Sequence, residues 1–459
     1  MRWSPTNTQW RTATISRSHY KPFAGTGQRV FPKPMNNQNQ DEYEQFAAFV
    51  AIDWADEKHA FRLQAAGQKK EAGTLEQKPE LIGAWLGTLR ERFGGRPIAV
   101  ALEQSRGALI HALLSYDFLV IFPIHPTTVA KFREAFKFSG AKSDPLDTDQ
   151  ILEILTKHLE QLKPLKPDTE QTRLLSRLVA DRRKTVDLRT RQIQALKASL
   201  KEYFPQALQI LSNNVSSRLA GDFLKKWPNF AAFQQARPST IKRFFYGHNV
   251  RSPQVIEQVL KVAEKSQPLT TDAAIVESGQ RLSQMHAELI QKLNPFIEQY
   301  DQQIEKVFHN HHEAKLFTGL PGAGSVLAPR LLVAFGSDRS RLQSAQNMQM
   351  FSGIAPVTKS SGKSRVVYAR CACPKFLRQT FHEFARLSVE KSQWARNYLD
   401  YYTDKGKKYH TIIRSLAFKW IRILFRCWKD RTPYDEEKHM ETLRKRGSIF
   451  ATLHLKEHA

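Results

Sequence analysis

The sequence has few cysteines and no long apolar segment. Its three cysteines, Cys371, Cys373 and Cys427, are too few and too clustered for a disulfide framework, which fits a reducing cytoplasm. No apolar run approaches the roughly 20 residues that cross a bilayer. There is also no lipidation motif and no basic amphipathic anchor. We therefore expect a cytoplasmic protein without a membrane partner.

Acidic residues are scarce as well. The chain has 44 Asp and Glu against 70 Lys and Arg, a net charge of +26, which predicts a polyanionic partner such as nucleic acid. Residues 1–40 hold six basic residues and no acidic one, and we expect residues 1–44 to form a disordered basic arm. Residues 356–431 hold 18 basic and 5 acidic residues, half of the excess charge.

Residues 45–165 alternate between short apolar runs and segments of helical periodicity, which predicts an α/β domain. The expected strands are 49–53, 59–63, 97–103 and 118–122, and the expected helices are 81–93, 108–115 and 129–138. A further helix is expected to begin at Ser143 or Asp144, with Pro145 at its first position.

Four carboxylates occupy key points of this domain. Asp53 and Glu103 end two of the expected strands, and Asp144 and Asp147 lie three residues apart in the first turn of the later helix. Such a set could hold two divalent cations, Mg²⁺ or Mn²⁺, for phosphodiester chemistry. Asp53 alone would be an ordinary hairpin residue. Trp54-Ala55 follows it where ATP-binding sugar-kinase folds need glycine, which argues against ATP.

The middle region, residues 166–310, contains two long expected helices, 169–204 and 275–308. Apolar residues recur in alternating steps of three and four, as in a coiled coil. The first seam includes Leu175, Val179, Leu196 and Leu200; the second includes Leu282, Met285, Leu289, Leu293, Phe296, Tyr300 and Val307. Arg182 and Arg189 interrupt the first seam, either to set its register or where it leaves its partner. An antiparallel hairpin and a dimerising stalk are both open.

Residues 311–432 contain a glycine-rich hairpin at 320–324 that opens a helix over 325–335. Its backbone N–H groups could hold a phosphate, or it could be an ordinary turn. We expect 357–365 to be a polar loop. The expected helix 410–428 places Lys419, Arg422 and Arg426 in a stripe suited to a phosphate backbone.

Together these motifs resemble those of the DEDD-type insertion-sequence transposases, a serine-bearing family described as bridge-RNA-guided recombinases. The matching pieces are Val50-Ala51-Ile52-Asp53, Ala101-Leu102-Glu103, Lys142-Ser143-Asp144-Pro145-Leu146-Asp147, Leu320-Pro321-Gly322-Ala323-Gly324, and Gly353-Ile354-Ala355-Pro356 followed by Ser360-Ser361-Gly362. The resemblance extends from about residue 46 to residue 429, and Thr148 departs from the family's usual alanine.

The resemblance implies a fold in three parts. An α/β RNase H-like (RuvC-like) metal-dependent domain would span 45–165, and a helical coiled-coil region with an insert would span 166–310. A mainly helical serine transposase domain would span 311–432, followed by a tail at 433–459.

The resemblance also implies a chemistry. Ser361 would be the nucleophile, with Ser360 as a competing candidate, and Mg²⁺ would be held by Asp53, Glu103, Asp144 and Asp147. Lys359, Lys363 and Arg365 would stabilise the phosphorane, and with Arg370, Lys419, Arg422 and Arg426 they would bind nucleic acid. The implied partners are donor and target DNA, a structured guide RNA, and further copies in a homodimer or homotetramer, in the bacterial cytoplasm at the nucleoid.

Two alternatives stay open from the sequence. The first is a metal-dependent, structure-specific endonuclease that hydrolyses DNA junctions with the carboxylates alone. The second is a relic that only binds DNA or RNA through residues 356–431.

Overall fold

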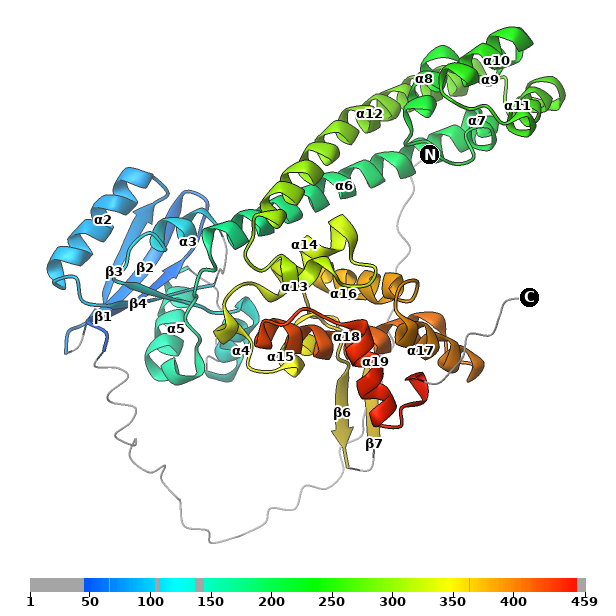
Figure 1. Cartoon of the computed structure of the whole chain (residues 1–459). Helices are drawn as coiled ribbons and strands as arrows, with labels where there is room; N and C mark the ends of the chain where they lie inside the picture. Colours follow the sequence, from blue (N-terminus) through cyan, green and yellow to red (C-terminus); the bar gives the residue numbers. More distant parts are fainter. Residues whose placement is uncertain (1–44, 66, 104–106, 137–143, 363, 452–459) are drawn as a thin grey trace, which may run out of the picture. The chain divides into compact units, whose positions relative to one another are not determined.

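The computed structural model describes residues 45–451 except 66, 104–106, 137–143 and 363 (Figure 1). The chain forms two compact units, residues 1–166 and 167–459. The expected basic arm, residues 1–44, and the end of the tail lie outside the described residues. No helix within those residues is long and apolar enough to span a bilayer.

The first unit is built on a mixed five-stranded sheet with strand order β3-β2-β1-β4-β5. Its strands are β1 (Ala48–Asp53), β2 (Lys58–Ala65), β3 (Glu71–Glu76), β4 (Ile98–Leu102) and β5 (Leu119–Pro123). β1, β4 and β5 run parallel, while β2 and β3 pair antiparallel at the other edge. The four expected strands are confirmed. β3 was not predicted, because Leu75 is its one buried residue.

Helices pack on both faces of this sheet, because side chains alternate along each strand. Large residues such as Val50, Ile52 and Val100 share a core with α2 (Pro79–Arg92) and α3 (Ala108–Leu113). The other face carries three alanines together with Phe49 and Phe122, and there the sheet shares a core with α4 (Pro126–Phe136) and α5 (Asp144–Lys157). The alanines at 51, 99 and 101 let α5 approach the sheet closely. This mixed α/β unit is consistent with an RNase H-like fold.

The second unit begins with a stem of two long helices, α6 (Glu170–Tyr203) and α12 (Ala273–His309), which pack against each other (Figure 1). The predicted seam of α6 is correct, since Leu175, Val179, Leu196 and Leu200 are buried. The two arginines that interrupt this seam do not mark a place where α6 leaves its partner, because both bond to α12. Arg182 Nη2 donates to Oδ2 of Asp301 at 3.0 Å, and Arg189 Nη1 donates to Oδ1 of Asn294 at 2.9 Å.

The predicted seam of α12 is only partly correct, since Tyr300 and Val307 pack against the core but four other residues of the seam do not. Leu282, Met285, Leu289 and Phe296 are 39–55% exposed, while Ser283, Ala287, Ile290, Ile297 and Ile304 are buried. The helix carries two apolar stripes that overlap in sequence. The small side chains of Ser283 and Ala287 let the buried stripe approach α6 closely, so this stripe forms the contact between the two helices. The exposed stripe, which contains Leu282 and has larger apolar side chains, faces outward.

Five short helices at the distal end of the stem form what we call the head, residues 204–266. They are α7 (Pro205–Ile210), α8 (Arg218–Lys226), α9 (Phe230–Gln234), α10 (Pro238–Gly247) and α11 (Pro253–Lys265). Their core is aromatic, with Phe204, Phe223, Trp227, Phe233 and Phe245 all buried.

The rest of the second unit is mainly helical, as expected. Its helices are α13 (Lys315–Thr318), α14 (Gly324–Phe335), α15 (Ala345–Phe351), α16 (Lys375–Ser388), α17 (Gln393–Asp404), α18 (Tyr409–Asp430) and α19 (Glu436–Lys445). They pack around α18, where Leu416, Trp420 and Leu424 are buried.

The expected polar loop at 357–365 is instead a β-hairpin, β6 (Val357–Ser361) and β7 (Ser364–Tyr368). Gly362 turns the chain with a φ of +53°, and the β-branched pair Val366-Val367 favours a strand. Almost every residue of this hairpin is exposed, so polarity alone did not distinguish it from a loop.

Candidate active site

Two of the predicted carboxylates lie at the carboxyl-terminal ends of two adjacent, central strands of the sheet. Ile52 of β1 is the parallel partner of Leu102 of β4, so Asp53 and Glu103 are neighbours in the register. Because parallel strands carry their carboxyl ends to the same edge, both side chains arise from rigid, buried backbone. Both residues are partly exposed.

A buried histidine that the sequence analysis missed fixes the turn after Asp53. The backbone N–H of Ala55 donates to Nδ1 of His59 at 3.2 Å, so the ring proton lies on Nε2, which donates to Oε1 of Gln77 at 2.6 Å. His59 is fully buried. A lone histidine in a strand carries no distinctive sequence signal, so only the three-dimensional arrangement identifies it as a positioning residue.

Asp147 reaches this part of the fold from α5, which packs on β1, β2 and β4. Asp147 is buried and paired with Arg133 of α4, whose Nε also donates to Oε1 of Gln150 at 3.2 Å. The expected helix start is confirmed. The side chain of Asp144 lies outside the described residues, so its place beside the other three carboxylates stays a prediction.

A metal site is not assembled within the described residues, where no three His, Cys, Asp or Glu side chains lie close enough to hold an ion. The donor set nevertheless suits Mg²⁺ or Mn²⁺, because carboxylate oxygens are the ligands these ions prefer. The guanidinium of Arg133 lies against Asp147 and supplies positive charge there. Arg133 bonds to Oδ1 of Asp147, so this guanidinium and a bound cation would compete for the charge of the same carboxylate.

The predicted nucleophile lies at the tip of the exposed β6–β7 hairpin. Ser361 is paired with Ser364, and Ser360 is paired with Arg365. Because adjacent side chains of a strand point to opposite faces, Ser360 and Ser361 do not share a face. Lys359 shares the face of Ser361, and its Nζ lies 5.7 Å from the ring centre of Tyr368. Lys363 lies outside the described residues.

The Gly353–Pro356 motif directly precedes this hairpin and contacts the residues that follow it. Arg370 Nε donates to the carbonyl of Ala355 at 3.3 Å, so this predicted nucleic-acid contact also has a structural role. Gly353 has a φ of +74°, and a Cβ there would lie 2.3 Å from Sγ of Cys373. The described cysteines are free thiols. Cys373 therefore packs against Gly353 at the base of the hairpin, whereas Cys371 is exposed.

The predicted basic stripe of α18 is exposed, but two of its three residues contact neighbours. Arg426 pairs with Asp430 at 3.4 Å. The ammonium of Lys419 lies 5.4 Å from the ring centre of Tyr398; partial desolvation of this end of the side chain, and then the charge of Arg422, lower the pKa of Lys419. Arg422 has no such partner among the described residues and is the freest cation of the three.

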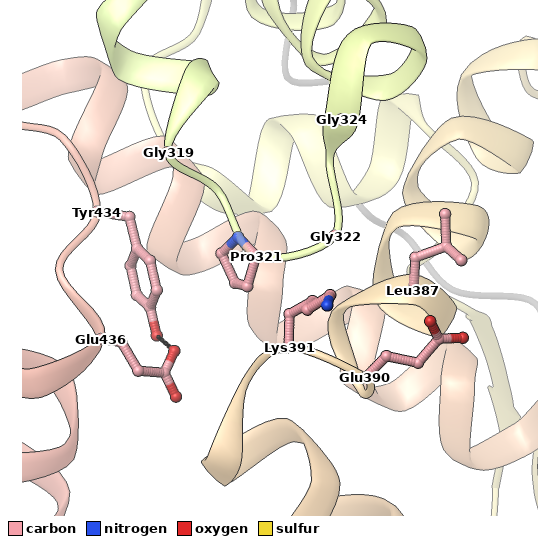
Figure 2. A pocket seen from close by; sticks show the side chains of 9 residues that line it. All are labelled: Gly319, Pro321, Gly322, Gly324, Leu387, Glu390, Lys391, Tyr434 and Glu436. Atoms are coloured by element: carbon pink, nitrogen blue, oxygen red, sulfur yellow. Dashed lines mark hydrogen bonds between the residues drawn. The ribbon is translucent and has the colours of Figure 1, made fainter.

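The glycine-rich hairpin opens α14 as expected and borders a pocket of about 600 Å³ (Figure 2). Gly322 packs on the backbone of α16, since a Cβ there would lie 2.6 Å from the carbonyl carbon of Leu387. The pocket lining includes Lys391 but also Glu390 and Glu436. Close packing explains the glycine, and the two carboxylates make this pocket a poor place for a phosphate.

Comparisons with known proteins agree with this architecture. A DEDD transposase profile of IS110 type matches residues 50–205, and a profile of the IS116/IS110/IS902 transposase family matches residues 314–400. A mini-circle protein for IS117 from Streptomyces coelicolor is 24% identical over 86% of this chain and 97% of its own length. The 42 kDa protein of insertion element IS900 from Mycobacterium paratuberculosis is 24% identical over 73% of this chain and 83% of its length. The 43.6 kDa protein of IS110, also from S. coelicolor, is 22% identical over 82% and 92%.

Proposed function

Because the chain belongs to the IS110-type family of DEDD transposases, we propose that it moves its own insertion sequence by serine-mediated cleavage and exchange of DNA strands. The observation that carries this proposal is the presentation of Ser361 at the tip of an exposed, cation-bearing hairpin. A nucleophile that attacks DNA must be accessible to a duplex, and nearly all of this hairpin is exposed.

In the proposed step, Oγ of Ser361 bonds to a DNA phosphorus while the bond from that phosphorus to a deoxyribose oxygen breaks. The hydroxyl proton passes to a general base, and the departing deoxyribose oxygen takes up a proton and leaves as a hydroxyl. Attack of another strand's hydroxyl on the serine phosphodiester then restores the serine. Lys359 lies on the same face as Ser361 and would stabilise the negative charge of the phosphorane.

Asp53, Glu103, Asp144 and Asp147 would hold Mg²⁺, or Mn²⁺ in its place. The bound ion would supply charge stabilisation at the reacting phosphate. The adjacency of Asp53 and Glu103 supports this assignment. The chain's own contribution would be to position the carboxylates through His59 and α5, while Arg133 competes with the ion for the charge of Asp147.

A homodimer or homotetramer is proposed from the outward stripe of α12. Ile275, Leu282, Leu289 and Phe296 recur every seven residues and are 39–55% exposed. A strict seven-residue apolar repeat is typical of a coiled-coil seam. Changing Leu282 and Leu289 to Glu should lower the oligomeric state in analytical ultracentrifugation. Leu174→Glu, on an exposed site of α6, is the matched control and should not.

We also propose that a structured RNA guides the choice of site in the bacterial cytoplasm, at the DNA of the nucleoid. The net charge of +26 supports a polyanionic partner beyond one short DNA site. Sequence would then be recognised by base pairing, and the protein would recognise backbone and shape.

The test is a trapping experiment with full-length protein, RNA transcribed from the flanks of its element, labelled donor DNA and Mg²⁺. After denaturation, a covalent protein–DNA band is expected for the wild type and for Ser360→Ala, but not for Ser361→Ala or Asp53→Ala. Cleaved DNA without a covalent band, unaffected by Ser361→Ala, would instead identify a metal-dependent endonuclease. A band lost with Ser360→Ala alone would move the nucleophile to Ser360. No cleavage by the wild type, with binding retained, would favour a relic.

A further inference from the structure

The head carries a long stretch without any acidic residue. Residues 225–256 contain six basic residues and no Asp or Glu. The six, all exposed, are Lys225, Lys226, Arg237, Lys242, Arg243 and Arg251. The head lies mostly outside the two transposase profiles, so the known domains do not account for this charge.

These cations are not used to hold the head together. None of the six forms an ion pair with any residue that the structure describes. Within the described part of the chain, only Lys226 has a close contact of another kind, with its Nζ 5.0 Å from the ring centre of Trp227 and 5.5 Å from that of Phe244. On a solvated surface, basic residues are usually interspersed with acidic ones. Here the positive charges reinforce one another.

The cations are presented in a definite arrangement. On α10, Ser239, Lys242, Arg243 and Tyr246 occupy positions i, i+3, i+4 and i+7, which form one exposed stripe. Arg237 precedes this helix and Arg251 follows it, so cations lie beyond both of its ends. Tyr246 is 50% exposed and places an aromatic ring within the stripe.

The head is also rigidly attached to the stem. Gln291 Nε2 donates to the carbonyl of Ser217 at 2.9 Å, and Asn294 Nδ2 donates to the carbonyl of Ser216 at 3.0 Å. A Cβ at Gly221 would lie 2.8 Å from Cγ of Gln291, so α8 lies closely on α12. The aromatic core then fixes α10 relative to α8, because Phe223 contacts Phe244 and Phe245.

We propose that this stripe, which we call the α10 surface, binds the backbone of double-stranded DNA without regard to sequence. The major groove of B-form DNA is about 12 Å wide and admits an α-helix, so α10 can enter it while Arg237 and Arg251 reach phosphates on either side. The major groove of duplex RNA is too narrow for side chains to enter. The charge therefore favours a nucleic acid, and the helical shape of the surface favours DNA.

Binding of the full-length chain to a duplex of arbitrary sequence, about 30 base pairs long, tests this proposal. Fluorescence anisotropy is measured without divalent ions, so that cleavage plays no part and the serine chemistry is not being tested. The variant is Lys242→Gln, Arg243→Gln and Arg251→Gln combined. The control neutralises three exposed lysines of the stem, Lys201→Gln, Lys292→Gln and Lys306→Gln.

The head variant should bind DNA about 10-fold or more weakly at 150 mM salt, and its log–log salt slope should fall by about 2 to 3. The control should stay within about twofold of the wild type. Equal losses for the two variants would overturn the proposal, since the effect would then be general charge. A larger loss for an RNA duplex of the same length would also overturn it. Unchanged circular dichroism and melting temperature establish that the head variant is folded.

Discussion

Arg133 donates from Nη2 to the buried carboxylate of Asp147, with 20% and 9% of the two side chains exposed. We predict that Arg133→Gln is destabilised by roughly 2–4 kcal/mol without metal, because the Asp147 charge is left buried and uncompensated. If Asp147 is a metal ligand, Mn²⁺ should raise the melting temperature of this variant more than that of the wild type. Thermal unfolding with and without Mn²⁺ measures both effects.

Arg90→Gln is the matched control for this experiment. Arg90 pairs with Asp117 at 3.4 Å, but their side chains are 56% and 80% exposed, and such a pair contributes little. Equal stabilisation of Arg133→Gln and the wild type by Mn²⁺ would exclude Asp147 from the metal site.

The two faces of the β6–β7 hairpin predict different effects for its two described cations. Lys359 shares a face with Ser361, and Arg365 shares a face with Ser360. At saturating DNA, Lys359→Gln should slow formation of the covalent adduct about 100-fold, as expected when a charge-stabilising group is lost. Arg365→Gln should slow it far less. Quenched time courses measure the rate of adduct formation in both variants. A larger loss of rate in Arg365→Gln than in Lys359→Gln would point to Ser360 as the nucleophile.

Gly322 should tolerate no side chain. Its φ is +78°, and a Cβ would lie 2.6 Å from backbone atoms of Leu387, which cannot move aside. We expect Gly322→Ala to reduce the free energy of unfolding by more than about 2 kcal/mol. Gly319→Ala is the control, because nothing lies within 4 Å of a Cβ there, and it should change stability by less than about 1 kcal/mol. Urea unfolding measures both, and equal stabilities would contradict the packing argument.

Stability should fall in mild acid because of His311, which is buried where α12 meets α13. Glu313 N–H donates to its Nδ1 at 3.1 Å, and its Nε2 lies 2.8 Å from Oγ1 of Thr172. Burial, and then the nearby His312, lower the pKa of His311 against the opposing effects of Glu313 and Asp168. The unfolded chain therefore takes up this proton first.

The contribution of His311 is complete above its ordinary pKa of about 6.5 and is lost as the pH falls from there toward the folded value. At pH 7.5, His311→Gln should be less stable than the wild type. On acidification to pH 5.5, its free energy of unfolding should fall by less than that of the wild type. His309→Gln, whose side chain is 60% exposed, should keep the wild-type pH dependence. Urea midpoints at the two pH values provide the measurement. An unchanged pH dependence in His311→Gln would contradict this assignment.

The sequence predicted what local patterns determine. Buried strands, the α5 start at Asp144 and both long helices follow from apolar period and capping, and all are confirmed. The choice between the two stripes of α12 depended on the packing of Ser283 and Ala287 against another helix, which no local pattern records. The β6–β7 hairpin was missed because exposed strands lack the alternation of buried and exposed residues.

The residues of the candidate site also fall into those that local sequence patterns predict and those that only the structure identifies. Asp53 and Glu103 could be placed at strand ends from sequence, and their adjacency then followed from parallel pairing. The roles of His59 and Arg133 depend on side-chain contacts with Gln77 and Asp147, which lie on other secondary-structure elements. No periodicity or motif in the sequence marks such side-chain contacts, so these roles become visible only in the folded structure.

The rigid stem also acts as a spacer of defined length. A 34-residue helix such as α6 extends about 50 Å, which equals about 15 base pairs of DNA. A duplex held by the α10 surface would therefore be contacted about one and a half helical turns away from anything bound at the base of the stem. Deleting two turns from both α6 and α12 should move that contact by about three base pairs, so the length of the stem would set the size of the DNA footprint.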